Sequence, residues 1–292
     1  MMQKKLFKKN WAISIWKGED PFHLKPLLED DRALLNGSEV SDVKSSSVAD
    51  PFLHFHEGKW YMYYEVVLQE NGKGEIGLAS SENLVDWTYH QIVLREPFHL
   101  SYPQVFSDGG QLYMVPESRK AGGVRLYRCT QFPDQWTFDA TLLEGDFADA
   151  TIFRYEGKCY MFVLEGIDNF HIYFADDIRG PWRTHAVNPI LEADVTKSRP
   201  GGKVLKFQGH LHRITQGGFP IYGTNVRAFR INKLSPDEYQ EEELSVSPIL
   251  KQQRHGWAGS GMHHMDAHQL SDGEWIAAVD GRGVRFNLFN IN

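Results

Sequence analysis

The stretch Asp50-Pro51-Phe52-Leu53-His54-Phe55-His56-Glu57-Gly58, followed by Lys59-Trp60-Tyr61-Met62-Tyr63-Tyr64-Glu65, is typical of a β-hairpin. A polar residue opens an alternating apolar run, a turn glycine follows eight residues later, and a second run reaches a polar residue seven residues after the glycine. The same spacing recurs in four later segments, at Tyr102–Gly110–Glu117, Asp149–Gly157–Leu164, Gly201–Gly209–Gln216 and Met265–Gly273–Asp280. A unit repeated in this way indicates a fold built from similar modules.

Each of the first three hairpins is followed by a third strand-like run and a tryptophan. These runs and tryptophans are 76–80 with Trp87, 124–128 with Trp136, and 171–175 with Trp182. Four strands in about 50 residues predict the blade of a propeller. We therefore expect an all-β, five-bladed β-propeller in one domain, residues 1–292. The expected blades cover about 42–98, 99–145, 146–193, 194–250, and 258–292 together with 11–30.

The fifth unit is short, because only twelve residues follow Asp280. The run from Trp11 to Trp16 is a strand candidate that could supply an outer strand and close the ring. Such closure would remove a free sheet edge, which otherwise favours aggregation. A two-sheet sandwich is the competing all-β fold, but it does not account for the repeated spacing.

Composition excludes several classes of function. The net charge is −7 and no basic run follows the first nine residues, which argues against nucleic acid as a partner. No apolar stretch reaches the ~18 residues of a membrane span. The apolar run 11–16 is too short for a signal peptide, and Cys129 and Cys159 show neither disulfide nor metal spacing. These features predict a cytoplasmic protein. The aromatic share of 13% suits both β-cores and sugar stacking.

The repeat also predicts where the chemistry lies. The hairpin register places Asp50 beside Glu65, Tyr102 beside Glu117, Asp149 beside Leu164 and Glu165, and Met265 and Asp266 beside Asp280. Because blades are radial, these open ends should meet at one mouth of the central channel, together with Arg199 and Gln216. Clustered like charges raise one another's pKa, which favours a functional pocket over ordinary solvated strand ends.

A histidine-rich run precedes the last hairpin. On a strand, His264, Asp266 and His268 alternate onto one face and would supply metal ligands, although polar lining of the channel explains them equally well. We therefore expect no required cofactor, with a single divalent cation in the channel as the open alternative.

Two families resemble this sequence. Ala49-Asp50-Pro51-Phe52 and Gly58-Lys59-Trp60-Tyr61-Met62 are similar to the first blade of family-43 type glycoside hydrolases, which are five-bladed propellers. The resemblance implies that Asp50 is a general base and that Asp149 orients it and tunes its pKa. The acid of that family is a fourth-blade glutamate, whereas this chain has Ser198-Arg199-Pro200-Gly201-Gly202 there.

A second resemblance covers about residues 11–285. The stretches 72–79, 96–103, Val115-Pro116-Glu117-Ser118 and Val124-Arg125-Leu126-Tyr127 resemble the N-terminal domain of plant glucosamine inositolphosphorylceramide transferases and its bacterial relatives. This resemblance implies a glycan or glycolipid setting and brings no catalytic residues with it.

Three functions follow as hypotheses. The first is a glycosidase-like enzyme with Asp50 as base, Asp149 as the orienting residue, and Glu117 or Glu165 as acid. Further polar residues of the site are expected to bind the substrate. These candidate ligand-binding residues are Glu65, Tyr102, Arg119, Arg199, Gln216, His264, Asp266 and Asp280.

The second hypothesis is a transferase or phosphorylase that uses an activated sugar, with Arg119, Arg199 and His264 on the phosphate. The third is a glycan-recognition module without catalysis. All three predict a glycan, glycolipid or activated sugar as partner, and the fold alone does not choose among them.

Overall fold

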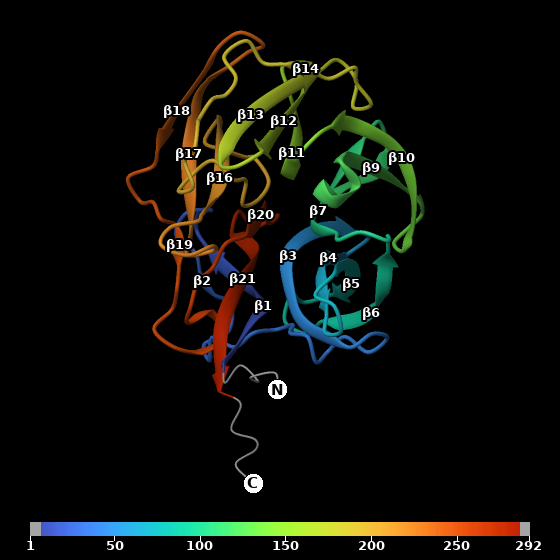
Figure 1. The fold of residues 1–292 in the computed structure, drawn as a ribbon. Helices are drawn as coiled ribbons and strands as arrows, with labels where there is room; N and C mark the ends of the chain where they lie inside the picture. Colours follow the sequence, from blue (N-terminus) through green and yellow to red (C-terminus); the bar gives the residue numbers. More distant parts are fainter. Residues whose placement is uncertain (1–6, 287–292) are drawn as a thin grey trace, which may run out of the picture.

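The computed structural model describes residues 7–286, which form five antiparallel sheets around a common centre (Figure 1). The predicted all-β, five-bladed propeller is confirmed. Within residues 7–286, helix is limited to two short 3₁₀ turns, η1 (Arg119–Ala121) and η2 (Gly256–Ala258). Among the described residues, no helix is long and apolar enough to cross a lipid bilayer.

The first three blades use their strands in chain order. The first blade contains β3 (Ser45–His56), β4 (Lys59–Leu68), β5 (Gly74–Ser81) and β6 (Thr88–Leu94). The second contains β7 (Ser101–Asp108), β8 (Gln111–Glu117), β9 (Gly123–Gln131) and β10 (Gln135–Glu144). The third contains β11 (Phe147–Tyr155), β12 (Lys158–Glu165), β13 (Asn169–Ala175) and β14 (Arg183–Thr184).

The last two blades depart from this simple order. The fourth contains β15 (Leu205–Phe207), β16 (His210–Gly217), β17 (Asn225–Leu234) and β18 (Tyr239–Glu243), and β19 (Leu250–Lys251) also pairs with β17. The fifth has the order β20 (Met265–Gln269), β21 (Trp275–Phe286), β1 (Phe7–Gly18) and β2 (Lys25–Pro26). The N-terminal strand β1 therefore lies inside the sheet that contains the last strand.

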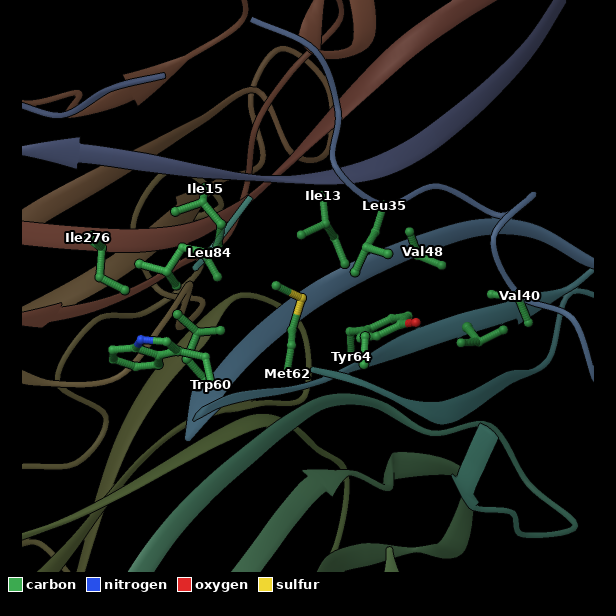
Figure 2. Close-up of a cluster of buried hydrophobic side chains, with 14 residues drawn as sticks. Ile13, Ile15, Leu35, Val40, Val48, Trp60, Met62, Tyr64, Leu84 and Ile276 are labelled. Carbon is green, nitrogen blue, oxygen red and sulfur yellow. The ribbon is translucent and has the colours of Figure 1, made fainter. Parts of the chain in front are cut away.

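The pairing of β1 with β21 runs without a break from Phe7 opposite Phe286 to Gly18 opposite Trp275. Figure 2 shows Ile13 and Ile15 of β1 facing the first blade, where they pack in one buried cluster with residues such as Met62. Burial of these apolar side chains joins the fifth blade to the first. Closure of the ring by β1 stays a prediction.

The innermost strands bring the functional residues together. Strands β3, β7, β11 and β20 lie nearest the centre, and β3 contacts both β7 and β20 (Figure 1). Side chains from four blades can therefore meet at the axis, although they come from distant parts of the sequence.

Candidate functional site

Three blades present a polar residue at the axis through the same backbone irregularity. The ladder between the first two strands is interrupted after Ala49, after Ser101 and after Ala148. The next residues, Asp50, Tyr102 and Asp149, have φ values of 52°, 45° and 53°. Left-handed backbone is unusual for residues other than glycine, and such bulges commonly redirect side chains at functional sites.

These bulges correct the predicted register. Ala49, not Asp50, lies opposite Glu65, and Ser101, not Tyr102, lies opposite Glu117. Ala148 lies opposite Leu164, and Phe147 opposite Glu165. A bulge carries an extra residue on one strand, so a constant-sum count along the hairpin is off by one there. The general location at the open ends of the hairpins is nevertheless as expected.

Asp50, His263 and Asp280 form a buried network. Asp280 is fully buried and accepts hydrogen bonds from the backbone N–H groups of Asp50 (3.0 Å), His263 (3.1 Å) and His264 (3.1 Å). The His263 Nδ1 atom lies 2.7 Å from Asp280 Oδ1, and its Nε2 atom lies 3.5 Å from Asp50 Oδ1. The ring of His263 therefore connects the two carboxylates.

The charges in this network shift the pKa values of its members. Burial alone would lower the pKa of His263, but the charge of Asp280 and their hydrogen bond raise it. The pKa of Asp280, which burial alone would raise, is correspondingly held below its ordinary value by His263. Burial raises the pKa of Asp50 to about 7, although His263 opposes the rise.

Asp149 has two dedicated donors from the fourth blade. Arg199 donates from Nε to Asp149 Oδ2 at 2.6 Å, and Gln216 donates to the same oxygen at 2.8 Å. Burial alone would lower the pKa of Arg199, but the charge of Asp149 raises it well above its usual range. This arrangement holds the Asp149 side chain in place.

Two glutamates complete the cluster. Burial raises the pKa of Glu65 well above its ordinary value, and the charges of Asp50 and Glu117 add to the rise. Burial and the charge of Asp149 raise the pKa of Glu117 to about 7. The Oε2 atom of Glu117 is buried without a hydrogen-bond partner in the described part of the chain.

His99 stands beside Glu65 and was not predicted. The backbone N–H of Gly74 donates to His99 Nδ1 at 2.8 Å, so the neutral ring carries its hydrogen on Nε2. That atom lies 3.3 Å from Glu65 Oε1. His99 therefore orients one oxygen of Glu65.

Two predicted residues lie outside the cluster. Glu165 accepts a hydrogen bond from the Tyr173 hydroxyl at 2.8 Å and lies 2.9 Å from His171 Nδ1, both on the third strand of its own blade. Arg119 pairs with Asp146 and donates to the carbonyl of Gly166 at 2.8 Å. Of the two predicted acids, Glu117 is the one that lies in the cluster.

Tyr102 is at the axis, but its hydroxyl is already engaged. It lies 2.8 Å from Thr151 Oγ1, donates to the carbonyl of Gly202 at 3.0 Å, and accepts from the N–H of Gly202 at 2.8 Å. These contacts join the second, third and fourth blades. We therefore assign Tyr102 a structural role rather than the predicted ligand contact.

The three predicted metal ligands do not converge. Asp266 accepts from the N–H of Leu53 at 2.6 Å and pairs with Lys203 at 3.2 Å and His268 at 2.9 Å. His264 instead directs Nε2 to the carbonyl of Pro51 at 3.0 Å. The predicted placement of Asp266 beside Asp280 is also wrong, because Asp266 lies opposite Ala278. A single divalent cation in the channel stays a prediction, which metal analysis of the purified protein would test.

His263 is the main residue that the sequence reasoning missed. In the predicted alternation it falls on the opposite face from His264, Asp266 and His268, and it precedes β20, which begins at Met265. Its ring stacks on Trp11 of β1, with ring centroids 4.1 Å apart. No local pattern in the sequence reports a contact between residues so far apart in the chain.

The class of this protein is therefore a five-bladed β-propeller with carboxyl groups gathered at its axis. Solved structures of carbohydrate-active proteins share the fold. A thermostable family-43 glycoside hydrolase matches with a TM-score of 0.59 and 18% identity, covering 80% of this chain and 88% of that chain. The β-1,2-mannobiose phosphorylase from Listeria innocua matches with a TM-score of 0.66 and 13% identity, covering 91% and 96%. At these identities the likeness concerns the fold alone.

Sequence comparison then defines the family. Residues 6–282 match the family described as glucosamine inositolphosphorylceramide transferase 1, N-terminal, and the chain belongs to this family. Glucosamine inositolphosphorylceramide transferase 1 from Oryza sativa subsp. japonica is 32% identical over 299 residues, which cover 94% of this chain and 40% of that protein. The Arabidopsis thaliana protein of the same name is 32% identical over 300 residues, with coverages of 94% and 39%. The chain thus spans about 40% of the length of these relatives.

Proposed function

We propose that the axial carboxyl cluster cleaves or transfers a glycosidic bond by general acid and base catalysis. The observation that carries this proposal is the position of Asp50 and Glu117, two carboxyl groups buried in the same axial cluster. Burial raises the pKa of both to about 7. Carboxyl groups with a pKa near neutral pH are suited to general acid and base catalysis.

The neighbouring residues support a role for each of these two carboxyl groups. His263, which Asp280 favours in its charged form, lies beside Asp50 and supports the ionised carboxylate that a base requires. Glu117 faces the negative charge of Asp149 and has an unpaired Oε2, which suits a protonated acid that donates to a leaving group. Asp149, held by Arg199 and Gln216, orients the site.

The test compares three variants that keep side-chain shape. Asp50→Asn and Glu117→Gln each remove one proposed catalytic group, and Glu165→Gln removes a carboxyl group outside the cluster. Hydrolysis or transfer should be measured on panels of alkyl and aryl glycosides. The first two variants should lose on the order of 10²–10⁴-fold in rate, whereas Glu165→Gln should retain it.

Leaving-group dependence separates the acid from the base. An aryl glycoside with a good leaving group needs little protonation, so Glu117→Gln should recover activity on it and Asp50→Asn should not. Wild-type rates in a folded Asp50→Asn protein would refute the base. A wild type that binds glycans and turns over none would leave a recognition module as the function.

A second candidate is transfer from a phosphate-activated sugar, and Arg199 is the observation that favours it. Its side chain is 28% exposed at the cluster, and guanidinium geometry matches phosphate. The matched relatives are also named as transferases. Arg199→Ala and Arg199→Lys should then lose activity on sugar phosphates or nucleotide sugars while retaining it on simple glycosides. Equal losses on both substrate types would return Arg199 to the support of Asp149. The proposed partner is accordingly a glycan, a glycolipid or an activated sugar.

A further inference from the structure

A cavity lies between the fifth and first blades, and its lining includes Trp11, which stacks on His263. It has a volume of about 480 Å³, within the range of small-molecule sites. Its lining includes Asn10 and Trp11 of β1, Ser45 and Ser46 at the start of β3, and Gln69 and Trp257. Asn10 and Trp11 lie on β1 just before Ile13, which is opposite Asp280, and Ser45 and Ser46 lie on β3 just before Asp50. The cavity is therefore on the same face of the propeller as the cluster.

Among the residues whose side chains the structure describes, the lining of this cavity carries no ionisable group. The hollow that continues it over the first blade is different, because Asp42 and Lys44 line that hollow. Amide and hydroxyl groups with an indole between them can hydrogen-bond a polyol and stack on its apolar face. A phosphate or a nucleotide would require cationic partners, which the described lining residues do not offer.

Two glycines of β21, Gly281 and Gly283, leave the space that Trp257 occupies. A Cβ atom at Gly281 would lie 2.6 Å from the Trp257 ring, and one at Gly283 would lie 3.1 Å from the Trp257 carbonyl. Only a strand without side chains at these two positions lets the indole approach so closely. The indole Nε1 also donates to Asp31 Oδ1 at 3.3 Å, which fixes the orientation of the ring.

Trp11 connects the cavity to the cluster. Its ring stacks on His263, the residue that joins Asp50 and Asp280, with an interplanar angle of 24°. A Cβ atom at Gly223 would lie 2.6 Å from the Trp11 ring, so this glycine leaves the space that Trp11 occupies. Trp11 therefore lines the cavity and also packs against the network of His263, Asp50 and Asp280.

We propose that this neutral cavity is a distal glycan subsite, in which Trp257, Gln69 and Asn10 bind an uncharged sugar unit of a substrate whose reacting bond lies at the axial cluster. This inference rests on the proposed function and deepens it, because it makes the substrate an oligosaccharide or a longer glycan rather than a monosaccharide derivative. The sugar in the cavity would be recognised by stacking and by its hydroxyl groups.

The experiment uses calorimetric titration of the full chain with uncharged tri- and tetrasaccharides and with the corresponding monosaccharides. Trp257→Ala should weaken oligosaccharide binding roughly tenfold and leave monosaccharide binding unchanged. Trp257→Phe, which keeps an aromatic face, should retain most of the affinity. Gln69→Ala changes an exposed side chain, so it tests the same subsite should Trp257→Ala fail to fold.

The outcomes separate this inference from the proposed function. Oligosaccharide affinity unchanged in folded Trp257→Ala and Gln69→Ala would overturn the subsite and leave the catalytic proposal standing. Weakened binding in these variants, with full turnover by Glu117→Gln, would support the subsite and overturn the acid. If the wild type binds no oligosaccharide more tightly than its monosaccharide, the subsite is wrong. Equal loss of affinity in Trp257→Ala and Trp257→Phe would also count against stacking.

Discussion

Glu117 and Glu165 have the same side chain and similar positions in their blades, yet their surroundings give them different chemistry. Glu117 is buried against Asp149 with one oxygen unpaired, whereas Glu165 is bonded to Tyr173 and His171. The repeat placed both near the end of a second strand. The single-residue offset in the third blade moves Glu165 to the end of β12, beside Asn169 of the next strand.

The buried Glu117 makes stability depend on pH. Its pKa is raised from 4.5 to about 7 in the folded protein, so between these values the folded state keeps a proton that the unfolded state releases. The contribution of Glu117 therefore falls as pH rises from about 4.5 to about 7. Glu117→Gln removes this effect and should gain on the order of 1–3 kcal/mol relative to wild type between pH 4 and pH 8.

Urea unfolding of both proteins at the two pH values measures this difference. Glu57→Gln, in an exposed turn of the first blade, controls for the loss of one negative charge. A stability difference between Glu117→Gln and wild type that is the same at pH 4 and pH 8 would contradict the raised pKa.

Sequence reasoning identified the members of the cluster better than their contacts. Asp50, Glu117 and Asp149 were found because the repeat places polar residues at equivalent positions. His263 and His99 were missed because each meets its carboxylate through a loop, where no periodicity applies. The pairing of Arg199 with Asp149 joins two blades, so it could not be predicted from a local sequence pattern either.

At the scale of single elements, the bulges explain why the register could not be predicted. Hairpin arithmetic assumes one residue opposite one residue, and nothing in Ala49-Asp50-Pro51 states that Asp50 adopts a left-handed backbone. The bulges turn Asp50, Tyr102 and Asp149 toward the axis. The same structural device therefore serves two carboxylates and one tyrosine.

The tyrosine has a distinct consequence for stability. Tyr102→Phe removes a hydroxyl that bonds to Thr151 and to both backbone groups of Gly202, which leaves buried polar groups unpaired. We expect a loss of about 1–3 kcal/mol in the free energy of unfolding, with no change in KM. Tyr160→Phe, at another buried tyrosine, is the matched control and should cost less. An increased KM with unchanged stability would instead show that Tyr102 contacts the substrate.

At the scale of the whole molecule, the recurring eight-plus-seven spacing was sufficient to predict the number and kind of sheets. Its success has a physical reason, because each hairpin must bury its apolar faces against neighbouring blades. The exact composition of the fifth sheet was harder, since β1 and β21 come from opposite ends of the chain. The run from Trp11 to Trp16 supplied the only local indication of a strand there.

Deletion of residues 1–17 tests what this strand contributes to the whole ring. The deletion removes almost all of β1, exposes the backbone of β21 as a sheet edge, and takes Ile13 and Ile15 from a buried cluster. Exposed edges recruit other chains, and loss of buried apolar side chains lowers the free energy of unfolding. We expect the truncated protein to unfold or aggregate, as measured by thermal melting and size-exclusion chromatography. Deletion of residues 1–6, which spares β1, is the control, and a peptide of residues 7–26 added in trans should partly restore the truncated protein. Unchanged melting temperature and solubility after removal of residues 1–17 would show that the ring does not depend on β1.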